Sequence, residues 1–242
     1  MPQLRRIDAA ADLTHSALRV SLAEQLARLR GTSVDDLPAP LLDVVVRNVE
    51  LPGGPVYVLR PKDWEALREE EGAAGRPVPY WARLWPSGDA LARALAGEPR
   101  GPGMHVLELG CGLGLPSIVA ARGGADVLAT DGSSDAVAFT AHALALNELE
   151  ATVAHADWDD DSAALIERGP FDLVLAADIL YTVRNSDAAL RILPQLLEPN
   201  GETRLADPDR AGGRRFLAAA RASFHVRTRE DGDVRLHTLR LR

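Results

Sequence analysis

The chain is poor in cysteine and has no long apolar run. Cys111 is the only cysteine among its 242 residues, which excludes an internal disulfide and a zinc site built on several cysteines. No stretch reaches the ~18 consecutive apolar residues that a membrane-spanning helix needs. No apolar core follows Arg5 and Arg6 to make a signal peptide. We therefore expect a cytoplasmic protein with no membrane partner.

Positive charge is also scarce. The formal net charge is −8 at pH 7, and Lys62 is the only lysine. A protein that holds nucleic acid through its phosphates needs clustered positive charge, so we expect no nucleic-acid partner. The apolar residues make up 46% of the chain, which is enough for one α/β domain with a continuous core and a smaller addition.

Residues 105–131, HVLELGCGLGLPSIVAARGGADVLATD, have the order strand, glycine turn, helix and second strand. The motif residues in this stretch are Glu108, Gly110, Gly112, Gly114 and Asp131. Glycines let the backbone come close to a ligand, and an acid about 20 positions after the first glycine can accept hydrogen bonds from ribose hydroxyls. The stretch therefore predicts a nucleoside site. Its pattern, E-x-G-x-G-x-G, differs from the G-x-G-x-x-G fingerprint of dinucleotide sites.

This stretch resembles the cofactor site of the seven-stranded, class I S-adenosylmethionine-dependent methyltransferases. The resemblance implies S-adenosyl-L-methionine as the cofactor, with the glycine loop around its methionine part, Asp131 on its ribose and no metal. It also implies an α/β fold, a Rossmann-like doubly wound seven-stranded sheet with a reversed last strand. The alternatives are a purely structural glycine turn and an NAD-dependent oxidoreductase.

Two elements are expected ahead of this domain. Leucines recur at helical spacing within residues 12–30, which predicts an amphipathic helix packed on the core or on a second copy of the chain. Residues 41–60 carry two β-branched runs around a Gly-Gly turn, which predicts a β-hairpin beside the active site. We divide the chain into an extension, residues 1–78, and a methyltransferase domain, residues 79–242.

Residues 79–88, PYWARLWPSG, hold two of the four tryptophans of the chain. We expect Trp85 to line the sulfonium end of the cofactor, because an aromatic face attracts a cation. The alternative is an aromatic cluster that attaches the extension to the core. After the third strand, Asp157 and Trp158 are expected at the adenine, where the carboxylate accepts from the exocyclic amine and the indole covers the ring. A solvated acidic loop is the alternative there.

Residues 171–177, FDLVLAA, form a continuous apolar run that is typical of a central parallel strand. Asp178 and Tyr181 follow it, at the edge of the sheet where ligands gather in doubly wound folds. We expect Asp178 to lie beside the cofactor and to receive the incoming nucleophile. Tyr181 is expected to wall the acceptor channel. These two residues are the candidate catalytic residues.

Three further motifs narrow the resemblance to one branch. They are W-P-S-G with Trp85, D-x-x-Y with Asp178 and Tyr181, and D-P-x-R with Asp207, Pro208 and Arg210. Together they resemble the family-16, nicotinamide N-methyltransferase-like group, above all the enzymes that methylate lysines of the electron-transfer flavoprotein β subunit. The resemblance implies N-methylation of a protein lysine. A small-molecule N- or O-methyltransferase and a catalytically silent S-adenosylmethionine-binding protein are the alternatives, and the oligomeric state is left open.

Overall fold

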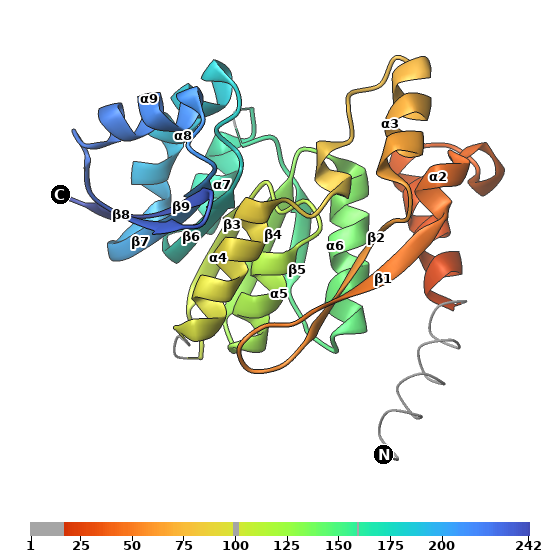
Figure 1. Ribbon diagram of the computed structural model, residues 1–242, viewed down its shortest axis with the longest axis horizontal. Helices are drawn as coiled ribbons and strands as arrows, with labels where there is room; N and C mark the ends of the chain where they lie inside the picture. The colour runs from red at the N-terminus through yellow and green to blue at the C-terminus, as the bar shows by residue number, and fades with distance from the viewer. Residues whose placement is uncertain (1–16, 99–101, 159) are drawn as a thin grey trace.

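The fold is taken from a computed structural model, which describes residues 17–98, 102–158 and 160–242. Its centre is a seven-stranded sheet (Figure 1). In spatial order the strands are β5 (Thr152–His155), β4 (Asp126–Asp131), β3 (His105–Leu109), β6 (Phe171–Ala177), β7 (Leu197–Asp207), β9 (Val234–Leu241) and β8 (Phe224–Asp231). The first five are parallel, whereas β9 runs antiparallel to both β7 and β8. The predicted α/β class and the reversed last strand are therefore confirmed.

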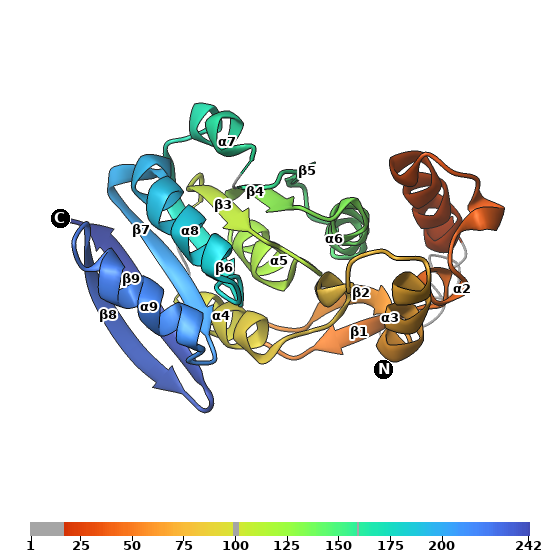
Figure 2. The same ribbon diagram turned by 90° about the horizontal axis from the view of Figure 1, so that it is seen from above.

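Both faces of the sheet are buried, because residues along each central strand alternate between two hydrophobic clusters. On β3, Val106 belongs to one cluster and Leu107 to the other. One face carries α4 (Pro86–Gly97), α5 (Leu115–Arg122) and α6 (Ser134–Leu146), and the other carries α7 (Ser162–Arg168), α8 (Val183–Leu196) and α9 (Ala211–Ala220) (Figure 2). This double cover explains the continuous apolar run of β6. Across the described ranges, no helix is both long and apolar enough to cross a membrane.

The carboxyl ends of β3, β4 and β6 meet at one edge of the sheet, because the three strands are parallel and β3 lies between the other two. Leu109, the last residue of β3, pairs with Thr130 of β4 and with Ala176 of β6. The segments that follow these strands are therefore neighbours. This register brings the glycine turn together with Asp131 and Asp178, although 47 positions separate the two acids in the chain.

The extension packs against the sheet domain and shares its hydrophobic core. Residues 17–30 are helical, and the part of the predicted helix before residue 17 lies outside the described residues. Leu22 and Leu26 of this helix are buried in the same hydrophobic cluster as Val106. The other elements of the extension are η1 (Val34–Asp36), α2 (Ala39–Leu42), β1 (Val44–Val49), β2 (Val56–Pro61) and α3 (Trp64–Ala73), and η2 (Tyr80–Ala82) follows just after it. A domain boundary at residue 78 stays a prediction.

Strands β1 and β2 form the predicted hairpin, a separate two-stranded antiparallel sheet. It is attached at the C-terminal ends of two helices. The Asn147 side chain, just after α6, accepts from the backbone N–H of Tyr57 at 2.9 Å and donates to its carbonyl at 2.7 Å. Arg122, at the end of α5, donates to the carbonyls of Pro52 and Gly54. These bonds hold the hairpin at the end of α5 that is opposite to the glycine turn.

Candidate active site

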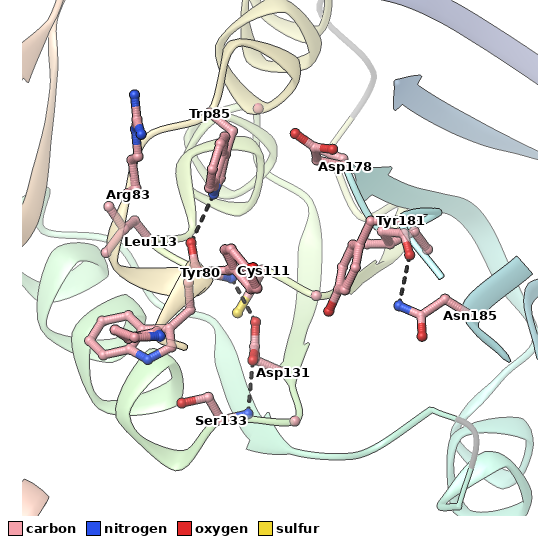
Figure 3. A pocket seen from close by; sticks show the side chains of 18 of the residues that line it. Tyr80, Arg83, Trp85, Cys111, Leu113, Asp131, Ser133, Asp178, Tyr181 and Asn185 are labelled. Atoms are coloured by element: carbon pink, nitrogen blue, oxygen red, sulfur yellow. Dashed lines mark hydrogen bonds between the residues drawn. The ribbon is translucent and has the colours of Figure 1, made fainter. Parts of the chain in front are cut away.

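A cavity of about 810 Å³ opens at the carboxyl ends of β3, β4 and β6. Of the predicted site residues, those that line it are Trp85, Glu108, Gly110, Gly112, Asp131, Asp157, Trp158, Asp178 and Tyr181. Figure 3 shows Trp85, Asp131, Asp178 and Tyr181 around one opening. A cavity of this volume is in the range of small-molecule sites. The register of the sheet thus brings nine of the ten predicted residues into one space.

The glycine turn comes close to its neighbours at two points. Gly110 has φ +67°, and a Cβ built there would lie 2.9 Å from the Ile179 side chain. Gly112 has φ +55°, and its Cβ would lie 3.3 Å from the Trp81 carbonyl oxygen. Positive φ and crowding both favour glycine at these positions. The turn therefore presents bare backbone to the cavity.

Gly114, the tenth predicted residue, has a different role from Gly110 and Gly112. It is the N-cap of α5 with φ +73°, and a Cβ there would lie 2.6 Å from Thr140 of α6. It does not line the cavity. Gly114 therefore lets α5 and α6 pack closely, and the expectation that it contacts the cofactor stays a prediction.

Asp131 is fixed by the backbone on both sides. Its Oδ2 accepts from the N–H of Gly112 at 2.9 Å, and its Oδ1 accepts from the N–H of Ser133 at 2.8 Å. Burial raises the pKa of Asp131, while these two N–H donors act in the opposite direction. A carboxylate has about four acceptor positions, so two remain for hydroxyl donors in the cavity. This arrangement fits a ribose with two free hydroxyls.

Glu108 is the most buried acid of the cavity. Its side chain accepts from the backbone N–H of Ser117 at 2.9 Å and from the Ser117 hydroxyl. Burial raises the pKa of Glu108 to about 8, against the lowering effect of the Ser117 donors. The acid is therefore mostly protonated at neutral pH. A cationic group of a ligand placed beside it would favour the ionised form.

Three aromatic rings form the rim of the cavity. The ring centroid of Tyr80 lies 6.3 Å from that of Trp85 and 6.1 Å from that of Tyr181. Tyr80 is 50% exposed and Tyr181 56% exposed. The indole N–H of Trp85 donates to the Tyr80 carbonyl at 2.8 Å, and the Arg83 guanidinium lies over the indole at 5.0 Å. We name Tyr80, Trp85 and Tyr181 the aromatic rim.

Asp178 lies deeper than the aromatic rim. Its backbone has φ +61°, a conformation that Asp adopts more readily than most residues. Its N–H donates to the Ala206 carbonyl of β7 at 2.9 Å, so the end of the sheet fixes the turn. The side chain is 10% exposed and forms an ion pair with Arg210. The acid therefore faces the cavity from a fixed position.

Residues 80–218 match the lysine methyltransferase family. The chain belongs to this family. It is 36% identical over 138 residues to the electron transfer flavoprotein beta subunit lysine methyltransferase of Xenopus laevis, which covers 55% of this chain and 54% of that protein. It is 33% identical over 129 residues to the ubiquinone biosynthesis O-methyltransferase of Xanthomonas campestris pv. campestris (strain B100), over 52% of each chain. The chain thus spans about half the length of these curated relatives.

The fold of this lysine methyltransferase family member also matches solved structures. The T. Thermophilus 16S rRNA N2 G1207 methyltransferase, solved with AdoMet and guanosine, superposes with a TM-score of 0.64 at 19% identity. The match covers 87% of this chain and 53% of that chain. Identity this low supports the fold alone. The predicted class of S-adenosylmethionine-dependent methyltransferases is confirmed by the family and the fold together.

The residues of the cavity fit S-adenosylmethionine. Asp131 offers two acceptor positions to the ribose, Gly110 and Gly112 leave backbone space for the methionine part, and Asp157 and Trp158 lie beyond β5, where the adenine is expected. In the described part of the chain, no group of three or more His, Cys, Asp or Glu side chains is placed to hold a metal ion. The individual cofactor contacts stay predictions.

The two expectations for the tryptophans of residues 79–88 apply to different side chains. Trp81 packs on Phe139 of α6 with ring centroids 4.8 Å apart, so it attaches this segment to the core. Trp85 lines the cavity. The aromatic density of this segment therefore has both a structural and a site component.

The expectation that the hairpin forms a wall of the active site is wrong. None of the residues of β1 or β2 lines the cavity, whereas residues 77–79, between α3 and η2, and Tyr80 of η2 do. The hairpin is attached instead through Asn147 and Arg122, at the opposite ends of α6 and α5. Tyr80 and Arg210 are site residues that the sequence did not single out, although Tyr80 lies in the aromatic segment and Arg210 in the D-P-x-R motif.

Proposed function

We propose that this protein transfers a methyl group from S-adenosylmethionine to the side-chain amine of a lysine in a protein substrate. The observation that carries the proposal is the shared cavity: Asp131 and Asp178 line the same space, which opens through the aromatic rim. The lysine methyltransferase family of the chain supports the same acceptor. No residue of the site identifies the substrate protein.

The bound cofactor supplies a methyl group that its positive sulfur already activates. The protein must then orient the acceptor, keep water away and hold the nucleophile neutral. Asp131 and the glycine turn fix one end of the cavity. Asp178 accepts an N–H of the neutral amine, so that the nitrogen lone pair is free to point along the cavity. Because a lysine enters as an ammonium, its proton leaves to water before the transfer.

The open rim favours a protein acceptor over a small one. Tyr80 and Tyr181 are each about half exposed, so the rim does not close over a small ligand. A lysine side chain could enter between these rings while the rest of its protein stays outside. Aromatic faces attract an ammonium group, which suits the protonated form of the entering side chain.

A small-molecule O- or N-methyltransferase is the second candidate, because the chain shares 33% identity with the ubiquinone biosynthesis O-methyltransferase. It would use the same cofactor end, Asp131 and the glycine turn. The acceptor of such an enzyme need not enter as a cation, so substitutions in the aromatic rim would affect its activity less. A silent cofactor-binding protein is disfavoured by the fixed position of Asp178 beside the cavity.

One labelling experiment separates these candidates. The protein is incubated with S-adenosylmethionine that carries a labelled methyl group and with a cell extract, and the extract is then split into protein and small-molecule fractions. We expect the label in methyl-lysine after acid hydrolysis of the protein fraction. Label only in small molecules would support the second candidate, and label in neither would support a silent protein. The Asp178→Asn variant is the matched control for background transfer.

A cytoplasmic location is part of this proposal and is suggested by the sole cysteine, Cys111, which suits a reducing compartment. The net charge of −8 disfavours a nucleic-acid substrate held through phosphates. Fractionation of cells that produce the protein, followed by immunoblotting, tests the location.

A further inference from the structure

Arg210 is the cation that faces Asp178. It belongs to the D-P-x-R segment after β7, and its guanidinium forms an ion pair with the Asp178 carboxylate. Both residues line the cavity. The Asp178 side chain is 10% exposed and that of Arg210 is 38% exposed. The pair therefore lies at the acceptor end of the cavity, where the carboxylate is largely shielded from water and the guanidinium is partly exposed.

The turn that carries Arg210 is interlocked with the turn that carries Asp178. The backbone N–H of Arg210 donates to Asp207 Oδ1 at 2.8 Å. A Cβ at Gly213 would lie 2.5 Å from the same oxygen, and a Cβ at Gly212 would collide with the Leu180 carbonyl. Ser186 Oγ also reaches the Gly212 carbonyl at 3.4 Å. The close packing of these turns places Arg210 next to Asp178.

An unpaired carboxylate at this position would hinder the proposed reaction. A lysine ammonium has a pKa of about 10.4 in water, and a nearby negative charge raises that pKa further. The nucleophile must be the neutral amine, so Asp178 alone would bind the lysine in its unreactive form. A cation close to the same point has the opposite effect, since it favours loss of the proton.

We propose that Arg210 is a positioning residue for methyl transfer, which cancels the charge of Asp178 so that Asp178 can accept a hydrogen bond from the acceptor amine without trapping it as an ammonium. The inference rests on the proposed function, because it requires an amine acceptor. It assigns a role in the reaction to the arginine of the D-P-x-R motif. In this arrangement Asp178 supplies the direction of the hydrogen bond and Arg210 supplies the electrostatic balance.

The other charged groups near this pair are engaged elsewhere. Asp209 pairs with Arg214 and, at 2.8 Å, with Arg235, and Arg184 of α8 pairs with Asp160 at 3.2 Å. The pKa of Asp207 is raised by burial, against the N–H donors of Arg210 and Asp209. The titratable and charged groups around Arg210 are thus Asp178, Tyr181, Arg184, Asp207, Asp209, Arg214 and Arg235. Among the described residues, Arg210 is the one cation in an ion pair with Asp178.

The test is the pH dependence of lysine methylation at saturating substrate, measured between pH 6.5 and 10 with the same cell-protein fraction for every variant. Under this condition the acid limb reports ionisation in the enzyme–substrate complex, where the amine lies beside Asp178. Arg210→Gln should move the acid limb to higher pH by about one unit, because Asp178 is left uncompensated. Asp178→Asn should move it to lower pH, although turnover falls. The double variant should return the limb near its original position, and Arg210→Lys should keep it there.

Two controls separate charge from structure. The melting temperature and the affinity for S-adenosylhomocysteine, neither of which depends on the acceptor, should be similar in Arg210→Gln and Arg210→Lys. An acid limb that stays in place in Arg210→Gln, with Gln and Lys variants equally slow, would overturn the inference and leave Arg210 a structural contact. If the unmodified protein methylates no lysine, the proposed function fails first and the inference fails with it.

Discussion

The cofactor end and the acceptor end of the cavity are built in different ways. At the cofactor end, backbone N–H groups of Gly112 and Ser133 hold Asp131, and bare glycine backbone forms the wall. The acceptor end is built from side chains, namely the aromatic rim and the ion pair between Asp178 and Arg210. The cofactor end therefore depends on the path of the backbone, whereas the acceptor end depends on which side chains are present.

This difference suits the proposed chemistry. A site made of backbone tolerates changes of the side chains around it. The acceptor varies between proteins, and exposed side chains can change without disturbing the sheet. The cofactor end should therefore respond to substitution through binding, and the acceptor end through turnover.

The largest expected effect tests the acceptor end. Asp178→Asn keeps the size and shape of the side chain but removes its charge. Because the amine loses its charged hydrogen-bond acceptor, we expect turnover to fall by roughly 10²-fold or more, the scale of a lost positioning or proton-transfer group. The measurement is steady-state methylation of the protein fraction, together with calorimetric titration of S-adenosylhomocysteine.

Cofactor affinity should change much less than turnover in this variant. Asp187→Asn is the matched control, since Asp187 of α8 pairs with Arg215 of α9 and does not line the cavity. It should keep full activity. Equal losses of affinity and turnover in Asp178→Asn would assign Asp178 to the cofactor end and remove the contrast between the two ends.

Asp131→Ala gives the corresponding test of the cofactor end. It removes an acceptor that we place on the ribose, so the affinity for S-adenosylhomocysteine should fall by the ~1.5–3 kcal/mol of a hydrogen bond to a charged group. Titration calorimetry measures this directly. Asp157→Ala, at the expected adenine end, should cost less because only one contact is lost there. A loss for Asp157→Ala as large as that for Asp131→Ala would contradict the central place of the ribose contact.

The contrast between the two ends also explains what the sequence could predict. The cofactor end lies within residues 105–131, where strand, glycine turn, helix and acid follow one another at fixed spacing. Such local order determines geometry, so Glu108, Gly110, Gly112 and Asp131 were predicted to line the site and do line the cavity. The sheet followed from the same logic, because apolar runs such as residues 171–177 require cover on both faces.

The acceptor end is made of segments that are far apart in the chain. Tyr80 meets Tyr181 across 101 positions, and no local pattern shows that they face one another. Arg210 lies in a recognised motif, but its pairing with Asp178 follows only from the packing of the two turns that carry them. The hairpin was misplaced for a similar reason, since the side chains of Asn147 and Arg122 decide where it is attached.

A smaller effect is expected from the buried acid of the cofactor end. The pKa of Glu108 is raised from 4.5 to about 8 by burial, so the unfolded chain loses this proton at lower pH than the folded protein. The folded state binds more protons between these values, and stability therefore falls as the pH rises through this range. Glu108→Gln removes the titration. Relative to the unmodified protein, it should gain about 1.4 kcal/mol of unfolding free energy per pH unit in this window.

Urea unfolding at pH 6, 7 and 8, without cofactor, measures this difference. Glu167→Gln on α7 is the control for the Glu-to-Gln change itself, because Glu167 is exposed and its substitution leaves the buried acid in place. A flat difference for Glu108→Gln would mean that Glu108 is ionised in the folded protein. The cofactor end would then carry a negative charge beside Asp131 before any ligand is bound.

The least change is expected from the hydrogen bond between two members of the aromatic rim, Trp85 and Tyr80. Trp85→Phe keeps an aromatic face toward the cavity but removes the indole N–H that donates to the Tyr80 carbonyl, and it shrinks the face under Arg83. The lost hydrogen bond is worth about 1 kcal/mol. Because Tyr80 then turns more freely, the KM for the protein substrate should rise by about threefold to fivefold, while turnover at saturation and affinity for S-adenosylhomocysteine stay close to those of the unmodified protein.

Trp85→Ala, which removes the face as well, should also weaken cofactor binding if the indole lies beside the sulfonium. A Trp85→Phe variant that loses cofactor affinity but keeps its KM would place Trp85 wholly at the cofactor end.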